Sequence, residues 1–78
     1  MLTDDNETTR ATISVTINGQ ERIVPTGSTV GDFLTSRGYK VSMVIVELNG
    51  EIIPRDRSDR TILSAGDQVE LVHAVGGG

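Results

Sequence analysis

The chain contains no cysteine and no tryptophan among its 78 residues, and it has a single histidine, His73. Without thiols it can form no disulfide framework, no iron–sulfur cluster held by thiolates and no catalytic cysteine. One histidine without cysteine also excludes a zinc site of the usual nitrogen and sulfur type. A lone histidine on a strand is typical of a surface or packing residue, so we expect no catalytic role for it.

Aromatic residues are scarce as well, since Phe33 and Tyr39 alone make up the 3% aromatic content of a chain that is 36% hydrophobic. A chain of this length buries only ~60% of its unfolded surface, so valine, isoleucine and leucine must supply an efficient core. Such residues favour β-strands. No stretch is long enough to cross a membrane, and the amino end lacks the regions of a signal peptide. We therefore expect one cytosolic domain without a membrane partner.

Positive charge is in the minority, with seven basic against eleven acidic residues and a net charge of −4. This balance argues against a surface that binds nucleic-acid phosphates. It fits better an acidic protein that docks on basic surfaces of other proteins.

Alternating polar and apolar residues over 12–17 predict a half-buried strand. Asn18-Gly19 follows, which is the strongest short signal for a type I′ hairpin turn. The return strand is expected at 20–24, closed by Pro25. The folded unit therefore begins with a β-hairpin.

A short helix is predicted over 30–38, with Thr29 as its N-cap and Asp32 in the first turn. Its apolar stripe, with helical spacing, consists of Val30, Phe33, Leu34 and the methylene stem of Arg37. Gly38 suits a left-handed C-terminal cap. Gly31 either permits a close contact or merely weakens the helix, and we expect the second.

The remaining elements follow from β-branched runs and turn residues. The sequence predicts a buried strand at 43–48, a second Asn-Gly turn, a short strand at 51–53 before Pro54, a charged surface loop at 55–60, an inward segment at 61–63, a turn at 64–67 and a last strand at 68–75. If the last strand lies parallel to the first in the sheet centre, one helix covers one sheet face. This α+β architecture, a mixed sheet of four to five strands on one helix, is the ubiquitin-like β-grasp.

The domain is expected to span residues 12–75, after a flexible acidic leader at 1–11 and before a flexible glycine tail at 76–78. Glycines without Cβ atoms can thread a narrow enzyme tunnel, which favours a functional tail. The alternative interpretations are a frayed end and a cloning linker.

The chain resembles the ThiS family of sulfur carriers in thiamine biosynthesis over residues 13–78. The resemblance rests on Ile17-Asn18-Gly19, Val24-Pro25, Thr29-Val30, Val46-Glu47-Leu48-Asn49-Gly50-Glu51-Ile52-Ile53-Pro54-Arg55, Leu63-Ser64-Ala65-Gly66-Asp67 and His73-Ala74-Val75-Gly76-Gly77-Gly78. No single piece is decisive, but the series at this spacing is fairly specific.

The resemblance implies a carrier that is not an enzyme and binds no cofactor or metal of its own. The carboxylate of Gly78 would be adenylated with ATP by an E1-like adenylyltransferase. Sulfur from a cysteine desulfurase or another donor would convert it to a thiocarboxylate, which thiazole synthase would use. Val75, Gly76 and Gly77 would form the tail that enters the partner's active site, with Val75 and Gly76 at the exit from the domain.

A docking surface for these partners is expected on the open face of the sheet. Alternation places Val72 and Ala74 opposite the buried side of the last strand, and the same reasoning places Ile23 and Ile45 there. An exposed apolar patch of this kind is typical of an interface. The alternative is that these are scattered surface residues.

Two other functions stay open at this point. The first is the small subunit of molybdopterin synthase (MoaD) or a protein-conjugating modifier, which share the fold and a di-glycine end. The second is a β-grasp module that binds a partner without being modified.

Overall fold

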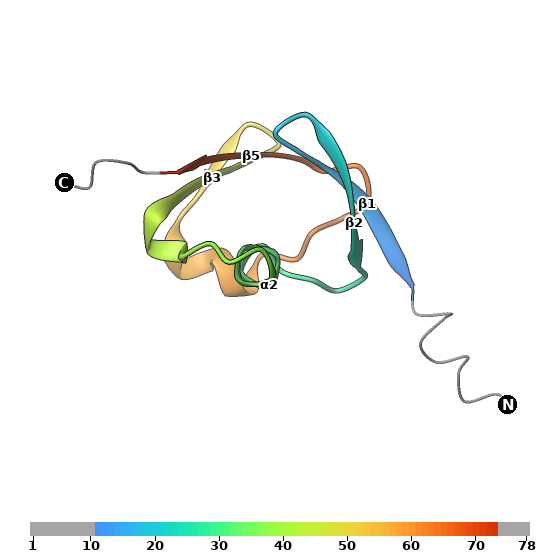
Figure 1. Cartoon of the computed structure of the whole chain (residues 1–78), viewed down its shortest axis with the longest axis horizontal. Helices are drawn as coiled ribbons and strands as arrows, with labels where there is room; N and C mark the ends of the chain where they lie inside the picture. The colour runs from blue at the N-terminus through green and yellow to red at the C-terminus, as the bar shows by residue number, and fades with distance from the viewer. Residues whose placement is uncertain (1–10, 74–78) are drawn as a thin grey trace, which may run out of the picture.

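A computed structural model describes residues 11–73 of the protein. One five-stranded sheet in the order β2-β1-β5-β3-β4 is covered on one face by the α-helix α2 and by two 3-10 helices, η1 and η2 (Figure 1). The elements are β1 (Thr12–Ile17), β2 (Gln20–Pro25), α2 (Val30–Ser36), η1 (Val41–Met43), β3 (Val44–Leu48), β4 (Glu51–Ile53), η2 (Arg55–Arg60) and β5 (Gln68–His73).

Two Asn-Gly turns build the two hairpins of the sheet. Asn18 and Gly19 have φ angles of 49° and 83°, and Asn49 and Gly50 have φ angles of 51° and 89°. Positive φ at both central positions matches the right-handed twist of the flanking strands. Both hairpins predicted from the sequence are confirmed.

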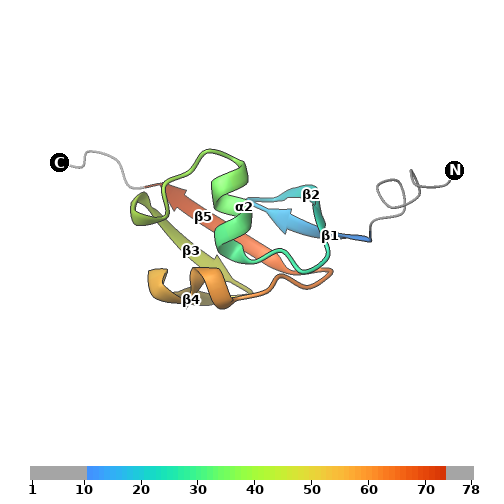
Figure 2. The same cartoon turned by 90° about the horizontal axis from the view of Figure 1, so that it is seen from below.

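The last strand, β5, lies in the centre of the sheet between the two hairpins (Figure 2). It pairs in parallel with β1, where Val69 lies beside Ile17, and antiparallel with β3, where Val69 lies beside Leu48. The predicted central position of the last strand and its direction are therefore confirmed, and with them the ubiquitin-like β-grasp.

The predicted N-cap of the helix is also confirmed. The hydroxyl of Thr29 accepts a hydrogen bond from the backbone N–H of Asp32, and the Asp32 carboxylate accepts one from the Thr29 N–H, both at 3.0 Å. This capping box satisfies two amide groups that the helix leaves open. The helix lays its apolar side on a core formed by Val15, Ile17, Val24, Val30, Phe33, Leu34, Val44, Val46, Leu63 and Val69.

The charged segment Arg55–Arg60 differs from its prediction as a surface loop. It forms the 3-10 helix η2, and Ser58 is buried against the rest of the protein with 2% of its surface exposed. A Cβ atom on Gly31 would collide with the carboxylate of Asp59 and would lie 3.4 Å from the Ser58 carbonyl oxygen. Gly31 therefore permits the close packing of α2 on η2, and the expectation that it merely weakens the helix is wrong.

Three smaller differences concern element limits and orientation. The strand expected from residue 43 begins at Val44, because residues 41–43 form η1. In the inward segment at 61–63, Leu63 is buried at 4% exposure but Ile62 points outward at 60%. The last strand is described as far as His73, so residues 74 and 75 of its predicted range lie outside the described part.

Among residues 11–73, no helix has the length and apolar character needed to cross a membrane.

Candidate functional site

The site expected from the sequence lies beyond the carboxyl end of β5. Ala74, Val75, Gly76, Gly77 and Gly78 are outside the described residues, so the structure locates the point from which they continue, which is His73. The His73 ring packs at a tilt of 49° against Tyr39, with 6.0 Å between the ring centroids. The histidine thus has a packing partner, in agreement with the structural role expected for it.

Asn18 holds β5 close to this end of the strand. The backbone N–H of Leu71 donates to Asn18 Oδ1 at 2.7 Å, and Asn18 Nδ2 donates to the Leu71 carbonyl oxygen at 3.4 Å. The backbone pairing of β1 with β5 ends at Ile17 and Val69. The amide side chain therefore extends the ladder by two residues toward His73.

Asn49 makes a similar contact from the other side, at the start of β5. Its Oδ1 accepts from the Gln68 N–H at 2.9 Å, and its own N–H donates to the Gln68 carbonyl oxygen at 2.7 Å. Its Nδ2 also donates to the Asp67 carboxylate at 3.0 Å. The asparagines of the two Asn-Gly turns therefore do more than form the turns that the sequence led us to expect. Both also hydrogen-bond to β5, the strand that leads to the tail.

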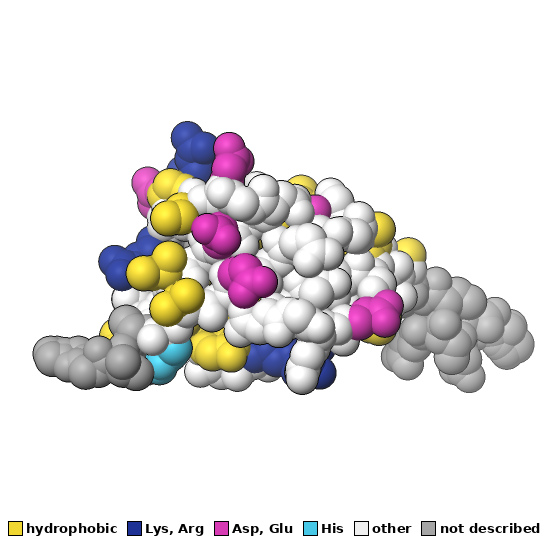
Figure 3. All heavy atoms as spheres, turned by 90° about the horizontal axis from the view of Figure 1, so that it is seen from above, with side chains coloured by type: hydrophobic (Ala, Val, Ile, Leu, Met, Phe, Trp, Pro, Cys, Tyr) yellow, Lys and Arg dark blue, Asp and Glu magenta, His cyan; other side chains and the backbone are white. Residues whose placement is uncertain are grey.

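The open face of the sheet carries an apolar cluster near the end of β5. Ile45 and Val72 lie directly opposite each other on β3 and β5 and are 49% and 59% exposed. Ile52, 65% exposed, lies on β4 opposite Glu47, and so beside Ile45 on the same face. We call Ile45, Ile52 and Val72 the open-face patch; Figure 3 shows hydrophobic side chains gathered at this end of the sheet.

The sequence analysis did not include Ile52 in the docking surface. A three-residue strand, Glu51–Ile53, with two adjacent isoleucines offers no alternation from which to choose the exposed one. The pairing of Ile52 with Glu47 decides it. Ile52 also lines a surface hollow of about 430 Å³ together with Ile45 and Pro54.

Ile23 is exposed, but the structure does not bring it together with Ile45 and Val72. It pairs with Ser14, whose carbonyl accepts from the N–H of Gly66 ahead of the first residue of β5. Val72 lies near the other end of β5, so it is ~20 Å from Gly66 at about 3.3 Å per residue. Ile23 is also three strands away from Ile45 in the sheet order.

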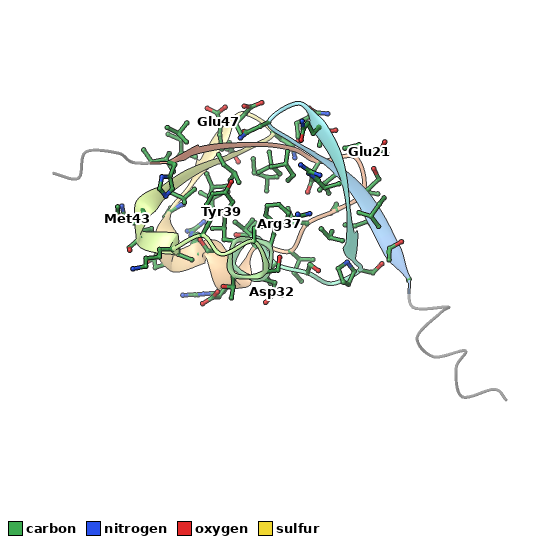
Figure 4. All side chains as sticks on the ribbon, in the orientation of Figure 1. Glu21, Asp32, Arg37, Tyr39, Met43 and Glu47 are labelled. Carbon is green, nitrogen blue, oxygen red and sulfur yellow. The ribbon has the colours of Figure 1, made fainter. Side chains whose placement is uncertain are left out.

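Two carboxylates border the open-face patch. Glu47 and Glu70 lie directly opposite each other on β3 and β5, and Figure 4 shows Glu47 on the side of the sheet away from α2. Like charges directly opposite each other destabilise a sheet. Such a pair fits a surface that meets positive charge on another protein. Within residues 11–73, no group of three or more histidine or acidic side chains is placed to hold a metal ion.

Fold and surface together define a ubiquitin-like β-grasp protein whose central strand leads to a glycine-rich end. The model of the ThiS family matches residues 11–78. The crystal structure of the thiamine biosynthesis protein ThiS from Geobacter metallireducens superposes with a TM-score of 0.71 and 33% identity, over 85% of this chain and 100% of that one. The chain belongs to the ThiS family, the family of the sulfur carriers of thiamine biosynthesis.

Curated relatives fall into two kinds. The sulfur carrier protein ThiS of Bacillus subtilis is 44% identical over 50 residues, which cover 64% of this chain and 76% of that protein. The thiazole synthases of Magnetococcus marinus and Paramagnetospirillum magneticum are 30% and 35% identical over 66 residues, or 85% of this chain. The chain spans only 20% of the length of each thiazole synthase.

Proposed function

We propose that this protein is a cytosolic sulfur carrier for the thiazole ring of thiamine and holds the sulfur as a thiocarboxylate on Gly78. The observation that carries the proposal is the family match, which extends through residue 78 and so includes the three final glycines. The position of β5 supports it, because β3 pairs with this strand as far as His73 and the Asn18 side chain holds its other side at Leu71, which gives the following residues a firm base.

Activation of the Gly78 carboxylate is needed because its negative charge repels nucleophiles and oxide is a poor leaving group. An E1-like adenylyltransferase would let a carboxylate oxygen attack the α-phosphorus of ATP, with release of pyrophosphate. A persulfide from a cysteine desulfurase system would then attack the acyl carbon, and AMP would leave. A thiol of the partner would next reduce the new S–S bond, which leaves the thiocarboxylate on Gly78 and a disulfide on the partner. All of this chemistry belongs to the partners, and the carrier contributes position.

The length of the segment after β5 suits a deep active site. Five residues follow His73, and extended residues span at most ~3.3–3.6 Å each, so Gly78 can reach ~17 Å from the strand end. Gly77 and Gly78 would enter the tunnel, where a Cβ atom would clash. Val75 and Gly76 would form the exit from the domain.

Thiazole synthase is the proposed acceptor of the sulfur. Two proteins of that name contain a segment similar to this whole domain within a chain about five times as long. A carrier domain within the acceptor's own chain would have a high effective concentration at its active site. The proposed docking surface for both partners is the open-face patch, and Ala74, expected there from the sequence, lies outside the described residues.

Intact-mass spectrometry tests the function directly. The protein is incubated with ATP, the E1-like enzyme and a sulfur donor, and we expect a mass increase equal to the exchange of one oxygen for sulfur, located at Gly78. The thiocarboxylate should then be consumed by thiazole synthase. Consumption in a complex with the large subunit of molybdopterin synthase instead would indicate a MoaD-like carrier, and no exchange with any activating enzyme would indicate a binding module.

A further inference from the structure

A hollow of about 280 Å³ lies on the other side of the sheet from the open-face patch, between the tip of the β1–β2 hairpin and the end of α2. Its polar side chains come from Asn18, Gln20, Arg22, Arg37 and Tyr39. We call these five residues the basic notch. Figure 4 shows Arg37 and Tyr39 on the helix side of the sheet, opposite Glu47.

Both guanidinium groups of the notch are held in position. Arg22 lies opposite the buried Val15, which places it on the helix-facing side of the sheet, and its Nη2 donates to Gln20 Oε1 at 2.6 Å. The Arg37 guanidinium carbon lies 5.3 Å from the centroid of the Phe33 ring. Packing on an aromatic face favours a cation and restricts its rotation. The two positive charges are therefore arranged around the hollow before any ligand arrives.

None of the side chains that line the notch is a carboxylate, although acidic residues outnumber basic ones by eleven to seven in the chain. Guanidinium groups bind planar oxyanions through paired hydrogen bonds. Tyr39 also lines the hollow, and its hydroxyl is a neutral group that can donate a hydrogen bond. The chemistry of the notch is thus that of a site for a carboxylate or a phosphate.

The position of the notch indicates where that anion comes from. Leu71 of β5 lines it, and Tyr39 packs against His73, the last described residue before the tail. Figure 3 shows basic side chains along the same edge of the molecule as the histidine. An enzyme that surrounds the residues after His73 must therefore lie next to the notch.

We propose that the basic notch receives an aspartate or glutamate side chain of the E1-like adenylyltransferase that acts on Gly78. This inference rests on the proposed function. The open face presents the carboxylates of Glu47 and Glu70, whereas the helix side presents the guanidiniums of Arg22 and Arg37. Opposite charges on the two sides of β5 fix the rotation of the carrier about the strand, so that the tail enters in one orientation only. Charge complementarity of this kind acts chiefly on association rate and specificity.

The binding experiment uses the full chain and the E1-like adenylyltransferase, with Arg22→Glu and Arg37→Glu compared against Arg60→Glu on η2. We expect each notch variant to raise Kd at least tenfold and to flatten its salt dependence, while Arg60→Glu stays within twofold of the unchanged protein. The rate of Gly78 conversion at saturating enzyme should stay unchanged in Arg60→Glu, which lies outside the notch. Equal Kd values for Arg22→Glu, Arg37→Glu and Arg60→Glu would overturn the proposal.

Two further measurements keep the result interpretable. Arg37→Gln removes the charge without placing a negative group at the helix end, where it would oppose the helix dipole; it should weaken binding in the same direction. Inorganic phosphate and acetate are titrated into the protein alone, with NMR detection of the arginine side-chain N–H groups. Saturable submillimolar phosphate binding would overturn a protein carboxylate as occupant. Failure of the proposed function is seen separately, as an unchanged mass of the wild-type chain.

Discussion

The side-chain amide of Asn18 pairs with both backbone polar groups of Leu71, a residue 53 positions away in the chain. The contact takes the place of a strand residue, because β1 has already turned into its hairpin where β5 continues. It lies two residues before His73, beyond the point where the backbone pairing of β1 with β5 ends at Ile17 and Val69. A side chain of the first turn is thereby hydrogen-bonded to the last strand.

Asn18→Gly should loosen the end of β5 and leave the turn intact, since glycine accepts the φ of 49° found there. A net hydrogen bond contributes about 1 kcal/mol, so we expect a loss of roughly 1–2 kcal/mol in the free energy of unfolding. Amide hydrogen exchange should show faster exchange at Leu71. Unchanged protection of this amide would contradict the role of the side chain.

Asn49→Gly provides the matched control, because it removes an equivalent side-chain contact at the start of β5. It should cost a similar free energy of unfolding, about 1–2 kcal/mol, but raise exchange at Gln68 rather than at Leu71. We expect sulfur loading of Gly78 to fall more in Asn18→Gly than in Asn49→Gly at equal stability. The reverse order would show that the tail-proximal contact has no special part in transfer.

Gly31 should tolerate only the smallest side chain. In Gly31→Ala the Asp59 carboxylate must rotate away, and this offsets the ~1 kcal/mol that alanine gains over glycine in a helix. Gly31→Leu should destabilise by roughly 1–3 kcal/mol, because the larger group meets the η2 backbone. Adding Asp59→Ala should turn Gly31→Ala into a stabilising change. Denaturant unfolding of the double-mutant cycle measures the coupling.

Ile45→Asp should weaken binding of the activating enzyme about tenfold or more, because it places a charge in the centre of an apolar contact. The side chain is about half exposed, so we expect the fold to persist, as checked by circular dichroism. Ile23→Asp is the control, since Ile23 is exposed on the same face but lies apart from the open-face patch. Equal loss in both variants would argue against a localised docking surface.

Glu70→Lys should stabilise the domain while impairing its function. The change replaces a like-charge pair with an opposite-charge pair across β3 and β5, for which we expect a gain of roughly 0.5 kcal/mol. At the same time it removes negative charge that attracts a basic partner surface. A higher Tm together with a lower association rate is the expected result, and an unchanged association rate would leave the Glu47–Glu70 pair without a docking role.

Added atoms in the glycine tail should impair sulfur loading of Gly78 without changing the stability of the fold. One extra residue after Gly78 should abolish loading, because the reacting carboxylate moves to a different position, and Gly77→Val should impair it by a clash in the tunnel. Both variants should keep the Tm of the unchanged protein within about 1 °C, since the change in folding free energy is near zero. Normal loading in either variant would contradict a mechanism led by the Gly78 carboxylate.

Much of the fold could be predicted because its signals are local. An Asn-Gly pair sets its own turn, Thr29 and Asp32 cap a helix within three residues of each other, and alternation separates the two faces of a strand. These features could be predicted without any knowledge of contacts between distant segments. The central place of β5 followed next, because a last strand parallel to the first in the sheet centre lets one helix cover one sheet face, and the observed strand order confirms it.

Other features depend on which distant segments meet. Nothing near Gly31 in the sequence indicates that residues 55–60 pack on it as a helix, since their alternating charges are typical of a solvated loop. Ile23 and Ile45 share the same alternation, yet their strands lie far apart, and Ile52 joins Ile45 only through the register of β3 with β4. Each of these depends on packing between segments that the local pattern does not connect.

The sequence by itself determined the turns, the capped helix, the faces of the strands that alternate and the glycine-rich end, because neighbouring residues act on one another through the backbone they share. The tertiary structure alone decided that Asn18 fastens Leu71, that Gly31 admits η2, and that Arg22 and Arg37 meet around one hollow. Such contacts arise only when the sheet brings its strands into register and the helix layer closes over it, which is a property of the whole chain.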